Sequence, residues 1–419
     1  MDMAFKNFNG NYGKLDYVAC WYAKTIEYIN DKTECAYVST NSIVQGESVA
    51  TMWKPLFDKG LNITFAWQPF VWNSQSNDKA HVHCVIVGFN NKHNIKLKTL
   101  YQNEIIYNEV DNINGYLLAA PNVFIQARCQ ILTPGIPTIS KGSQPTDGGN
   151  FFFSEIQRNE LLERYPSAKC LIKQFVGADE FINNKKRYCL WLKGINPSIY
   201  RNINPIIERL EAIAEIRRKS PTASVQRDAK TPMLFTQIRQ PEDNYIIVPR
   251  HSSENRDYIP MGFMSPDIIC GDANMMIPNA NIYLFGVLVS NVHMAWMKIV
   301  CGRLEMRYRY SPSVYNNFPW PTPTEAQKAK NEKTAQAILD ARALYPDSSL
   351  ADLYDEVTMP PELRKAHKAN DNAVMDAYGF KHDMTESEIV AELFKLYQKL
   401  VEAEQNQGEA KPKRTRKKS

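Results

Sequence analysis

The first ninety residues alternate between helical and strand-like patterns, and this order constrains the fold more than any other feature of the chain. Apolar residues recur at helical spacing over residues 15–29 and again over residues 49–57. Strand-like runs follow these segments at Cys35–Thr40 and Ile63–Trp67. A third run, His81–Phe89, is apolar on both faces after its first residues, as buried strands are. The order helix–strand–helix–strand–loop–strand predicts part of a doubly wound α/β sheet.

This stretch is too short for a whole domain of that class. A complete doubly wound domain needs roughly twice as many residues, and the chain contains no Gly-x-Gly-x-x-Gly turn of the kind that follows the first strand. We therefore expect an α/β fold class in which residues 1–90 form only the C-terminal half of a Rossmann-like sheet. Such a half-sheet would expose an edge strand and apolar faces.

Residues 91–320 are expected to form a mixed α/β domain that begins with a linker-like zone rich in Asn. We expect a helix over Ile206–Arg218, strands over Leu234–Ile238 and Tyr245–Pro249, and one long buried helix over Tyr283–Val300. The domain is also the basic part of the chain, because residues 156–320 hold 22 Lys and Arg against 15 Asp and Glu. The net charge of +5 for the whole chain does not by itself imply a nucleic-acid partner.

A stiff break at Pro319–Pro323 precedes a helical C-terminal segment, residues 321–405. Its apolar faces are expected at Leu350, Leu353, Tyr354 and Val357, and at Ile389, Leu393, Leu396, Tyr397 and Leu400. Thr385 and Glu388 form the pattern of a capping box. Residues 406–419 should be a disordered basic tail, with six Lys and Arg among the last nine residues. Both a solvated tail and nonspecific phosphate contact remain open for it.

Several classes of site are not favoured by the sequence. The eight cysteines include no Cys-x-x-Cys pair and no zinc spacing, so we expect buried, reduced thiols and a cytoplasmic location. His81 and His83 share one strand face but lack a third ligand, so no metal site is expected. Neither a Walker loop nor the common hydrolase motifs occur. No run approaches 18 apolar residues, so we expect neither a signal peptide nor a membrane span.

Eight blocks of sequence carry a resemblance to a known family. They are Val38–Glu47, Trp53–Phe57, Pro69–Trp72, His81–Phe89, Thr146–Asn150, Phe181–Trp191, Asp257–Phe263 and Tyr315–Pro321. In order and length they resemble the MmeI-like group of bacterial restriction-modification proteins (type IIL/IIG), and the match runs from about Lys14 to the end of the helical segment. Residues 1–90 would then be the C-terminal half of an S-adenosylmethionine-dependent methyltransferase sheet, and residues 91–320 a DNA target-recognition domain.

The resemblance implies site-specific adenine-N6 methylation of double-stranded DNA, with S-adenosylmethionine as the methyl donor. The family's donor-binding loop and its Asn-Pro-Pro-Phe or Asn-Pro-Pro-Tyr tetrapeptide should lie just before Lys14, and neither is found in the chain. We therefore expect no complete catalytic set here and no activity from this chain alone. The expected partners are DNA and a missing or separately encoded N-terminal methyltransferase or nuclease half. The alternatives are a DNA-specificity module without activity and an inactive remnant of a split gene.

Aromatic residues are expected beside the target base, because such enzymes extrude the base and stack it in a pocket. By resemblance, Phe70 and Trp72 lie in the loop before the final hairpin strands and would form a stacking wall; packing in the core or loop is the alternative. Asn41 and Ser42 follow a strand and would face the ligand crevice of an open sheet. They could instead cap the helix that includes Val49.

Base reading is expected from Glu305, Arg307 and Arg309, because alternating residues in an extended segment point the same way. Arg pairs with guanine through two hydrogen bonds, and Glu accepts from cytosine. The resemblance adds the region around Ala273, and a solvated face with phosphate contacts is the alternative. Further base-reading candidates are Arg250, Glu254, Arg256 and Arg303, and the phosphate-contact candidates are Lys141, Lys185, Lys186 and Arg187.

Overall fold

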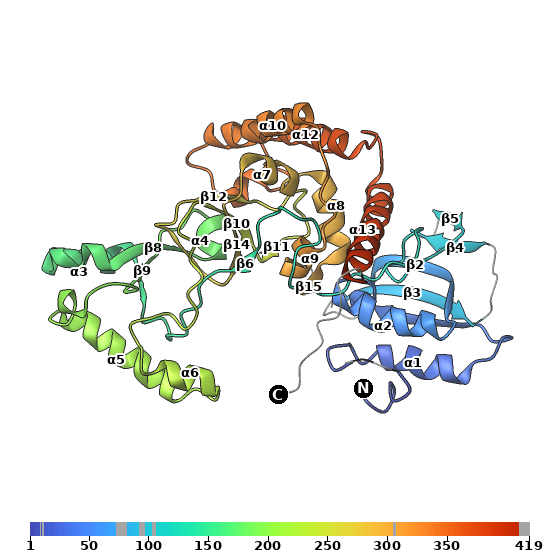
Figure 1. Ribbon diagram of the computed structural model, residues 1–419, viewed down its shortest axis with the longest axis horizontal. Helices are drawn as coiled ribbons and strands as arrows, with labels where there is room; N and C mark the ends of the chain where they lie inside the picture. The colour runs from blue at the N-terminus through green and yellow to red at the C-terminus, as the bar shows by residue number, and fades with distance from the viewer. Residues whose placement is uncertain are drawn as a thin grey trace. The chain divides into compact units, whose positions relative to one another are not determined.

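The structure is a computed structural model that describes residues 1–8, 10, 12–72, 82–91, 97–102, 106–304 and 307–409. The chain divides into two compact units (Figure 1). The first, here called unit 1, contains Met1–Ile136, Asn291–Thr322 and Met375–Ser419. The second, unit 2, contains Pro137–Ser290 and Pro323–Val374. Both units combine segments far apart in sequence, so they differ from the contiguous domains expected from the sequence.

A five-stranded mixed sheet forms the centre of unit 1, in the order β1-β3-β2-β4-β5. Its strands are β1 (Cys35–Thr40), β2 (Asn62–Trp72), β3 (Val82–Asn90), β4 (Lys98–Tyr101) and β5 (Tyr107–Val110). β3 is antiparallel to both β1 and β2, and β4 runs parallel to β2. The expected order of helices and strands is confirmed. The zone expected to be a linker instead adds β4 and β5 to the sheet.

Two helices, α1 (Ala19–Tyr28) and α2 (Glu47–Asp58), lie on the same side of this sheet (Figure 1). Their apolar positions converge on one core, where the ring of Tyr22 lies 5.4 Å from that of Trp53 and 5.3 Å from that of Phe89. Tyr22 and Trp53 are fully buried because the helical period places them on the face turned toward the sheet.

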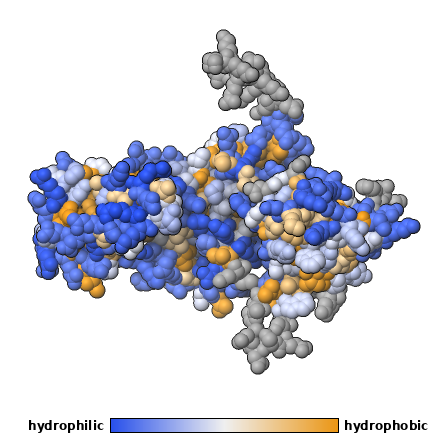
Figure 2. All heavy atoms as spheres, turned by 90° about the horizontal axis from the view of Figure 1, so that it is seen from below, coloured by the Kyte–Doolittle hydropathy of each residue, from blue (hydrophilic) through white to orange (hydrophobic). Residues whose placement is uncertain are grey.

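The opposite face of the sheet is less well covered. Val38 of β1 is 53% exposed, and its partner on β3, Ile86, is only partly buried. Among the described strands, β1 pairs only with β3 and is therefore an edge strand. Figure 2 shows hydrophobic surface among hydrophilic residues over the side of unit 1 that includes α1. Trp21 of α1 is one of its exposed apolar residues.

The remaining elements of unit 1 are helical apart from one hairpin. They are the short 3-10 helix η1 (Asn41–Val44), α8 (Asn291–Val300), β15 (Gly302–Leu304), β16 (Arg307–Arg309), α9 (Pro312–Asn316) and α13 (Glu386–Glu409). Trp296 of α8 is buried between Phe394 and Tyr397 of α13, with ring centroids 6.0 Å from each. The Trp296 indole donates to the carbonyl of Val314 at 2.9 Å, so α8, α9 and α13 share one core.

Unit 2 contains two four-stranded sheets, ordered β12-β10-β14-β6 and β13-β8-β9-β7. The first comprises β6 (Ser140–Lys141), β10 (Tyr245–Pro249), β12 (Gly262–Met264) and β14 (Asn274–Pro278). The second comprises β7 (Phe152–Phe153), β8 (Ile172–Val176), β9 (Tyr188–Leu190) and β13 (Ile269–Cys270). β11 (His251–Ser252) follows β10. The expected strand at Tyr245–Pro249 is confirmed as β10, and every one of its residues is buried.

Helices surround these sheets. They are α3 (Glu155–Arg164), η2 (Pro166–Leu171), α4 (Ala178–Ile182), η3 (Pro197–Ile199), α5 (Asn204–Arg218), α6 (Ala223–Asp228), α7 (Ile282–Leu288), α10 (Glu325–Ala343), α11 (Leu350–Leu353) and α12 (Pro361–Tyr378, of which the part to Val374 belongs to unit 2). The expected helix at residues 206–218 is confirmed as α5. α10 packs on α7, where the Asn370 amide of α12 also donates to the carbonyl of Gly286 at 2.8 Å.

Two expected elements of the middle region are wrong. Leu234–Ile238 is not a strand; only Gln237 forms an isolated bridge, with Gln144. The helix expected over Tyr283–Val300 is broken into α7 and α8. The buried Ser290 hydroxyl donates to the carbonyl of Val287 at 2.7 Å, a local bond of the kind that competes with helix hydrogen bonding. Apolar periodicity did not reveal this break, because both halves are almost wholly buried.

Smaller corrections concern the C-terminal segment and the cysteines. Val357 is 89% exposed, so it does not belong to the apolar face expected for it. α13 continues through residues 406–409, which were expected to be disordered, and residues 410–419 lie outside the described part. The Thr385–Glu388 capping box is confirmed by the Glu388 N–H to Thr385 Oγ1 bond of 3.3 Å and the Thr385 N–H to Glu388 carboxylate bond of 2.7 Å. Cys129 and Cys170 are exposed, contrary to expectation.

Within the described residues, no single helix is long and apolar enough to cross a membrane. α7 and α8 reach that length and composition only when they are taken together.

Candidate nucleic-acid interface

The β15–β16 hairpin of unit 1 presents two arginines on one face. β16 pairs antiparallel with β15, so Arg309 lies opposite Gly302 and Arg307 lies opposite Leu304. Arg307 and Arg309 are exposed, whereas Tyr308 between them is buried. The alternation expected from the sequence therefore holds for these two guanidinium groups. Glu305, the third expected reader, lies outside the described residues.

Arg303 lies on the other face of the same hairpin. Its cross-strand partner is Tyr308, and directly paired residues of an antiparallel ladder share a face. The Arg303 guanidinium sits over the Tyr308 ring, 4.5 Å from its centroid. Its Nε is buried and has no hydrogen-bond partner among the described residues. Burial raises the pKa of Tyr308, and the nearby charge of Arg303 opposes that shift. Arg303 is thus separated from Arg307 and Arg309, although all three were expected to read bases.

A polar hollow of about 290 Å³ lies beside Arg303, also within unit 1. Its wall is rich in side-chain amides, from Asn41, Gln45, Gln68 and Gln102, and it also includes Val44, Pro69, Tyr116, Leu118, Lys298, Ile299, Glu386 and Ser387. Lys298 and Glu386 form an ion pair of 2.7 Å. The hollow therefore offers amide donors and acceptors beside one guanidinium, which suits a polar, planar ligand better than a densely charged one.

Asn41 reaches this hollow because it directly follows β1, at the carboxyl end of the strand. The capping alternative is wrong, because the residue before α2 is Gly46 and no side chain caps that helix. The Ser42 hydroxyl instead donates to Asp16 at 2.7 Å. On the other side, the Gln68 amide donates to the carbonyl of Leu117 at 3.0 Å. Gln68 thereby reaches a buried turn inside the zone that was expected to be a linker.

Phe70 and Trp72 lie at the C-terminal end of β2 and not in a loop. They pair with Cys84 and Val82 of β3, so the strand continues further than its apolar pattern indicated. Their ring centroids are 6.4 Å apart, and Trp72 is 49% exposed. This exposure leaves the Trp72 ring available for stacking.

The candidates of unit 2 form a separate group around the turn between β13 and β14. Ala273 is exposed in this turn, and its carbonyl accepts from the Arg250 backbone at 3.2 Å. Arg250 Nη1 also donates to the carbonyl of Asp272 at 3.0 Å. Lys141 of β6 pairs with Met275 on the adjacent strand and is exposed. The fold thus brings together Ala273, Arg250 and Lys141, which sequence reasoning assigned separately.

The other two base-reading candidates of unit 2 lie in the turn after β11. The Arg256 backbone donates to the carbonyl of Ser253, and Glu254 lies between these residues. Burial lowers the pKa of Arg256, and the charge of Asp355 opposes that shift. Both side chains are only partly exposed, so they are less accessible than Arg307 and Arg309.

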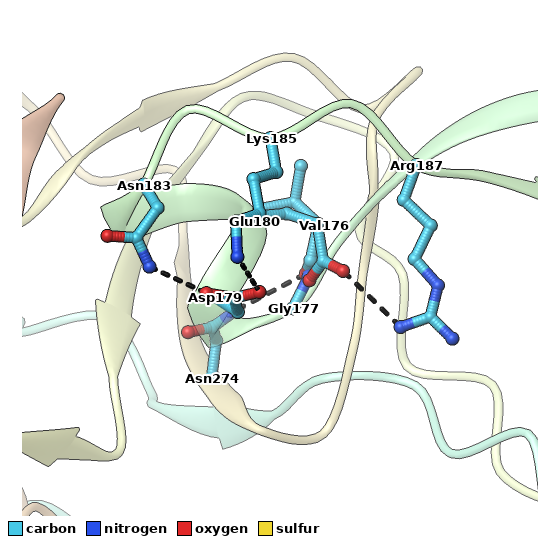
Figure 3. Close-up of polar contacts among 8 residues, drawn as sticks. All are labelled: Val176, Gly177, Asp179, Glu180, Asn183, Lys185, Arg187 and Asn274. Carbon is cyan, nitrogen blue, oxygen red and sulfur yellow. Dashed lines mark hydrogen bonds and ion pairs between the residues drawn. The ribbon is translucent and has the colours of Figure 1, made fainter. Parts of the chain in front are cut away.

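Three phosphate-contact candidates already hold carboxylate partners, as Figure 3 shows for two of them. Lys185 pairs with Asp179 at 2.8 Å, and Arg187 Nη1 with Glu180 at 3.3 Å. Lys186 pairs with Glu155 at 3.3 Å. The Glu180 side chain is only 10% exposed, but both lysine pairs are exposed, and exposed pairs contribute only about 0–1 kcal/mol. Phosphate oxygens could therefore replace the exposed carboxylates at little cost.

Arg187 also stacks 3.8 Å from the ring centroid of Phe152 and lines a hollow of about 440 Å³ with Lys185, Lys186 and Arg209. Sequence reasoning missed Arg209, which comes from α5. Within the described part of the chain, no three His, Cys, Asp or Glu side chains gather as metal ligands would.

Comparisons with known proteins cover almost the whole chain. Family models match residues 1–102 to the MmeI DNA-methyltransferase domain, residues 119–322 to the MmeI target recognition domain and residues 323–403 to the MmeI C-terminal domain. DNA methyltransferase A of Bacillus subtilis (strain 168) is 37% identical over 393 residues, which are 93% of this chain and 44% of that protein.

A solved structure of the type IIL restriction-modification enzyme MmeI in complex with DNA is also similar. It matches 95% of this chain and 54% of its own with 42% identity and a TM-score of 0.86. The chain thus spans about half the length of both relatives.

Proposed function

The chain belongs to the MmeI-like family of DNA methyltransferases with a target recognition domain, and on that premise we propose that it is the DNA-reading part of a site-specific adenine-N6 methyltransferase. It would act within a restriction-modification system on double-stranded DNA. One observation carries this proposal: Arg307 and Arg309 stand exposed on one face of a hairpin whose opposite face is buried.

Base reading by this hairpin follows from the chemistry of guanidinium groups. Arginine reaches the O6 and N7 acceptors of guanine with two hydrogen bonds in the major groove. We assign Arg307 and Arg309 as the principal readers, with Glu305 as the third. Ala273, Arg250 and the turn with Glu254 and Arg256 form a second reading group in unit 2.

Phosphate contacts complete the proposed interface. Lys141, Lys185, Lys186 and Arg187 are exposed or partly exposed cations of unit 2, and contacts of this type position a protein on DNA without reading its sequence. The exposed carboxylate partners of Lys185 and Lys186 would be exchanged for phosphate oxygens on binding. Neutralisation of phosphates by the four cations should make affinity fall as salt rises.

Methyl transfer would require S-adenosylmethionine, which supplies an activated methyl group to the extruded adenine. Among the described residues, the amide-lined hollow beside Asn41 provides no glycine-rich turn for a nucleotide-like donor, and two of its three charged residues, Lys298 and Glu386, are paired with each other. These residues do not make a complete donor site. They suit the extruded base better, with Phe70 or Trp72 as a stacking wall.

A missing or separately encoded N-terminal half would then supply the donor site by completing the sheet. The edge strand β1 and the exposed Val38 support this partner, because an unpaired edge and an uncovered apolar face are what a continuing sheet would bury. The alternatives remain a specificity module that binds DNA without catalysis and an inactive remnant.

The decisive experiment selects duplexes from a random library with the purified full chain. A common sequence motif among them supports the proposal, and duplexes without a shared motif contradict it. Incubation of the selected duplex with S-adenosylmethionine then tests activity: methylated adenine from this chain alone would overturn the need for a second part. Calorimetry with the donor tests the same point, because tight binding by the chain alone would place the donor site within it.

A further inference from the structure

The loop after β1 makes a backbone-to-backbone contact with the root of the reading hairpin. Gly46 has a φ of 62° and a ψ of −150°, a region that only glycine adopts without strain. A Cβ on Gly46 would lie 3.0 Å from both the Cα and the N of Gly302. The chain can therefore pass here only because Gly46 has no side chain between the two backbones.

Both sides of this contact are firmly held. The Trp53 indole donates to the carbonyl of Ile43 at 2.8 Å, in the same loop as Gly46. On the hairpin side, the Cys301 N–H donates to the carbonyl of Met297 at 2.9 Å, which ties the first residue after α8 to that helix. A displacement of the Gly46 loop would therefore move the hairpin, because hydrogen bonds hold the segments on both sides of the contact.

The contact lies directly across the ladder from a reading residue. Gly302 is the cross-strand partner of Arg309, and the next pair along the hairpin is Arg303 with Tyr308. Arg303 packs on the Tyr308 ring and lines the hollow together with Asn41 and Gln45. Its side chain therefore lies between the hairpin and the loop that ends at Gly46.

We propose that the Gly46–Gly302 contact and the Arg303 side chain set the position of the reading hairpin relative to the amide-lined hollow. Arg303 is then a positioning residue and not a base reader. This inference rests on the proposed function, and it deepens that function by coupling the two parts of one site. When Arg307 and Arg309 bind the correct bases, they would fix the position of the hairpin. Because the hairpin contacts the loop that lines the hollow, the hollow would then be held in the conformation that accepts the target base.

A matched pair of glycine variants tests the contact in the full chain without DNA. Gly46→Ala adds a Cβ that meets the Gly302 backbone, whereas a Cβ at Gly302 meets no described atom within 4 Å. Hydrogen exchange of the Arg303, Tyr308 and Arg309 amides should become about fivefold faster or more in Gly46→Ala. Exchange in Gly302→Ala should stay within about twofold of the unchanged chain. Equal exchange in both variants, with the α1 and α2 amides unchanged, would overturn the proposal.

Arg303 variants test the same idea through DNA, and they remain informative if Gly46→Ala fails to fold. If Arg303 positions the hairpin, Arg303→Met should keep the selected motif but lower discrimination by about fivefold or more, the size of one lost base contact. Arg303→Lys, which keeps the charge, should restore part of that loss. A changed base preference at one position in either variant would instead make Arg303 a reader and overturn the proposal.

The two readouts separate this inference from the proposed function. Absence of any motif for the unchanged chain would contradict base reading, while the exchange experiment would still decide whether the contact positions the hairpin.

Discussion

The buried Arg217 offers the largest single effect on stability that the structure predicts. Its side chain is 0% exposed, and it donates five hydrogen bonds, all to backbone carbonyls. These carbonyls belong to Pro145, Thr146, Asp228, Thr231 and Leu234, at distances of 2.7–3.2 Å. One guanidinium thus joins α5 to two separate loops of unit 2. Burial lowers the pKa of Arg217, and the charges of Asp228 and Asp147 oppose that shift.

Replacement by methionine keeps much of the volume and removes all five donors. Each hydrogen bond from a charged donor contributes about 1.5–3 kcal/mol, and burial of the charge offsets part of the total. Because the carbonyls remain buried after substitution, we expect Arg217→Met to lower the free energy of unfolding by about 3–5 kcal/mol. For a unit of this size, that corresponds to a fall in melting temperature of about 10 °C.

The neighbouring Arg218 provides the control. It lies on the same helix, and its ion pair with Glu215 is exposed, so Arg218→Met should cost less than about 0.5 kcal/mol. Urea unfolding followed by fluorescence measures both changes. If the two variants lose the same stability, the five carbonyl contacts do not hold the loops, and the reasoning fails.

Three further predictions concern unit 2. Burial holds the pKa of His367 well below its ordinary value of 6.5, so the folded residue is neutral. Above about pH 6.5 the residue is neutral in the unfolded chain as well, and its burial then adds no pH-dependent cost to the free energy of unfolding. The free energy of unfolding should fall as the pH drops below that value, because the imidazole is protonated in the unfolded chain but not in the folded one. The urea midpoint of His367→Gln should fall less steeply with pH than that of the unchanged chain. Parallel plots of midpoint against pH for the two proteins would contradict this. Lys141→Gln should weaken binding to selected and scrambled duplexes alike and reduce the slope of log affinity against log salt by about 1, whereas a loss confined to the selected duplex would make Lys141 a reader. Gly142→Ala should destabilise unit 2 by roughly 1–3 kcal/mol, because its Cβ would collide with the carbonyl oxygen of Gly271; an unchanged melting temperature in calorimetry would exclude that close approach.

The strands of unit 1 could be predicted because strands buried on both faces are continuous apolar runs, and strands buried on one face alternate apolar with polar residues. Cys35–Thr40 coincides with β1, and His81–Phe89 differs from β3 by one residue at each end. The end of β2 could not be predicted, because Phe70 and Trp72 lie where the strand leaves the core. The break between α7 and α8, where the Ser290 hydroxyl bonds to the carbonyl of Val287, leaves the apolar period intact.

The exposed face of β16 could be predicted in part. Alternation correctly predicted that Arg307 and Arg309 share a face, whereas Arg303, a separate base-reading candidate, lies on the other face of the hairpin. Arg303 lies on the neighbouring strand β15, where its pairing with Tyr308, and not its spacing from Arg307, sets its face. Of the amide-lined hollow, only Asn41 was expected at a ligand crevice, because the other lining residues come from segments that only the tertiary fold brings together.

The central claim is that the β16 arginines read base edges, and changing one reader tests it most directly. Glutamine pairs with adenine through two hydrogen bonds, where arginine pairs with guanine. The full chain with Arg307→Gln should therefore select a motif in which one G·C pair becomes A·T, with the other positions unchanged. The Arg303→Gln chain, as control, should select the original motif. If Arg307→Gln also selects the original motif, these arginines do not read bases, and the proposed interface is wrong.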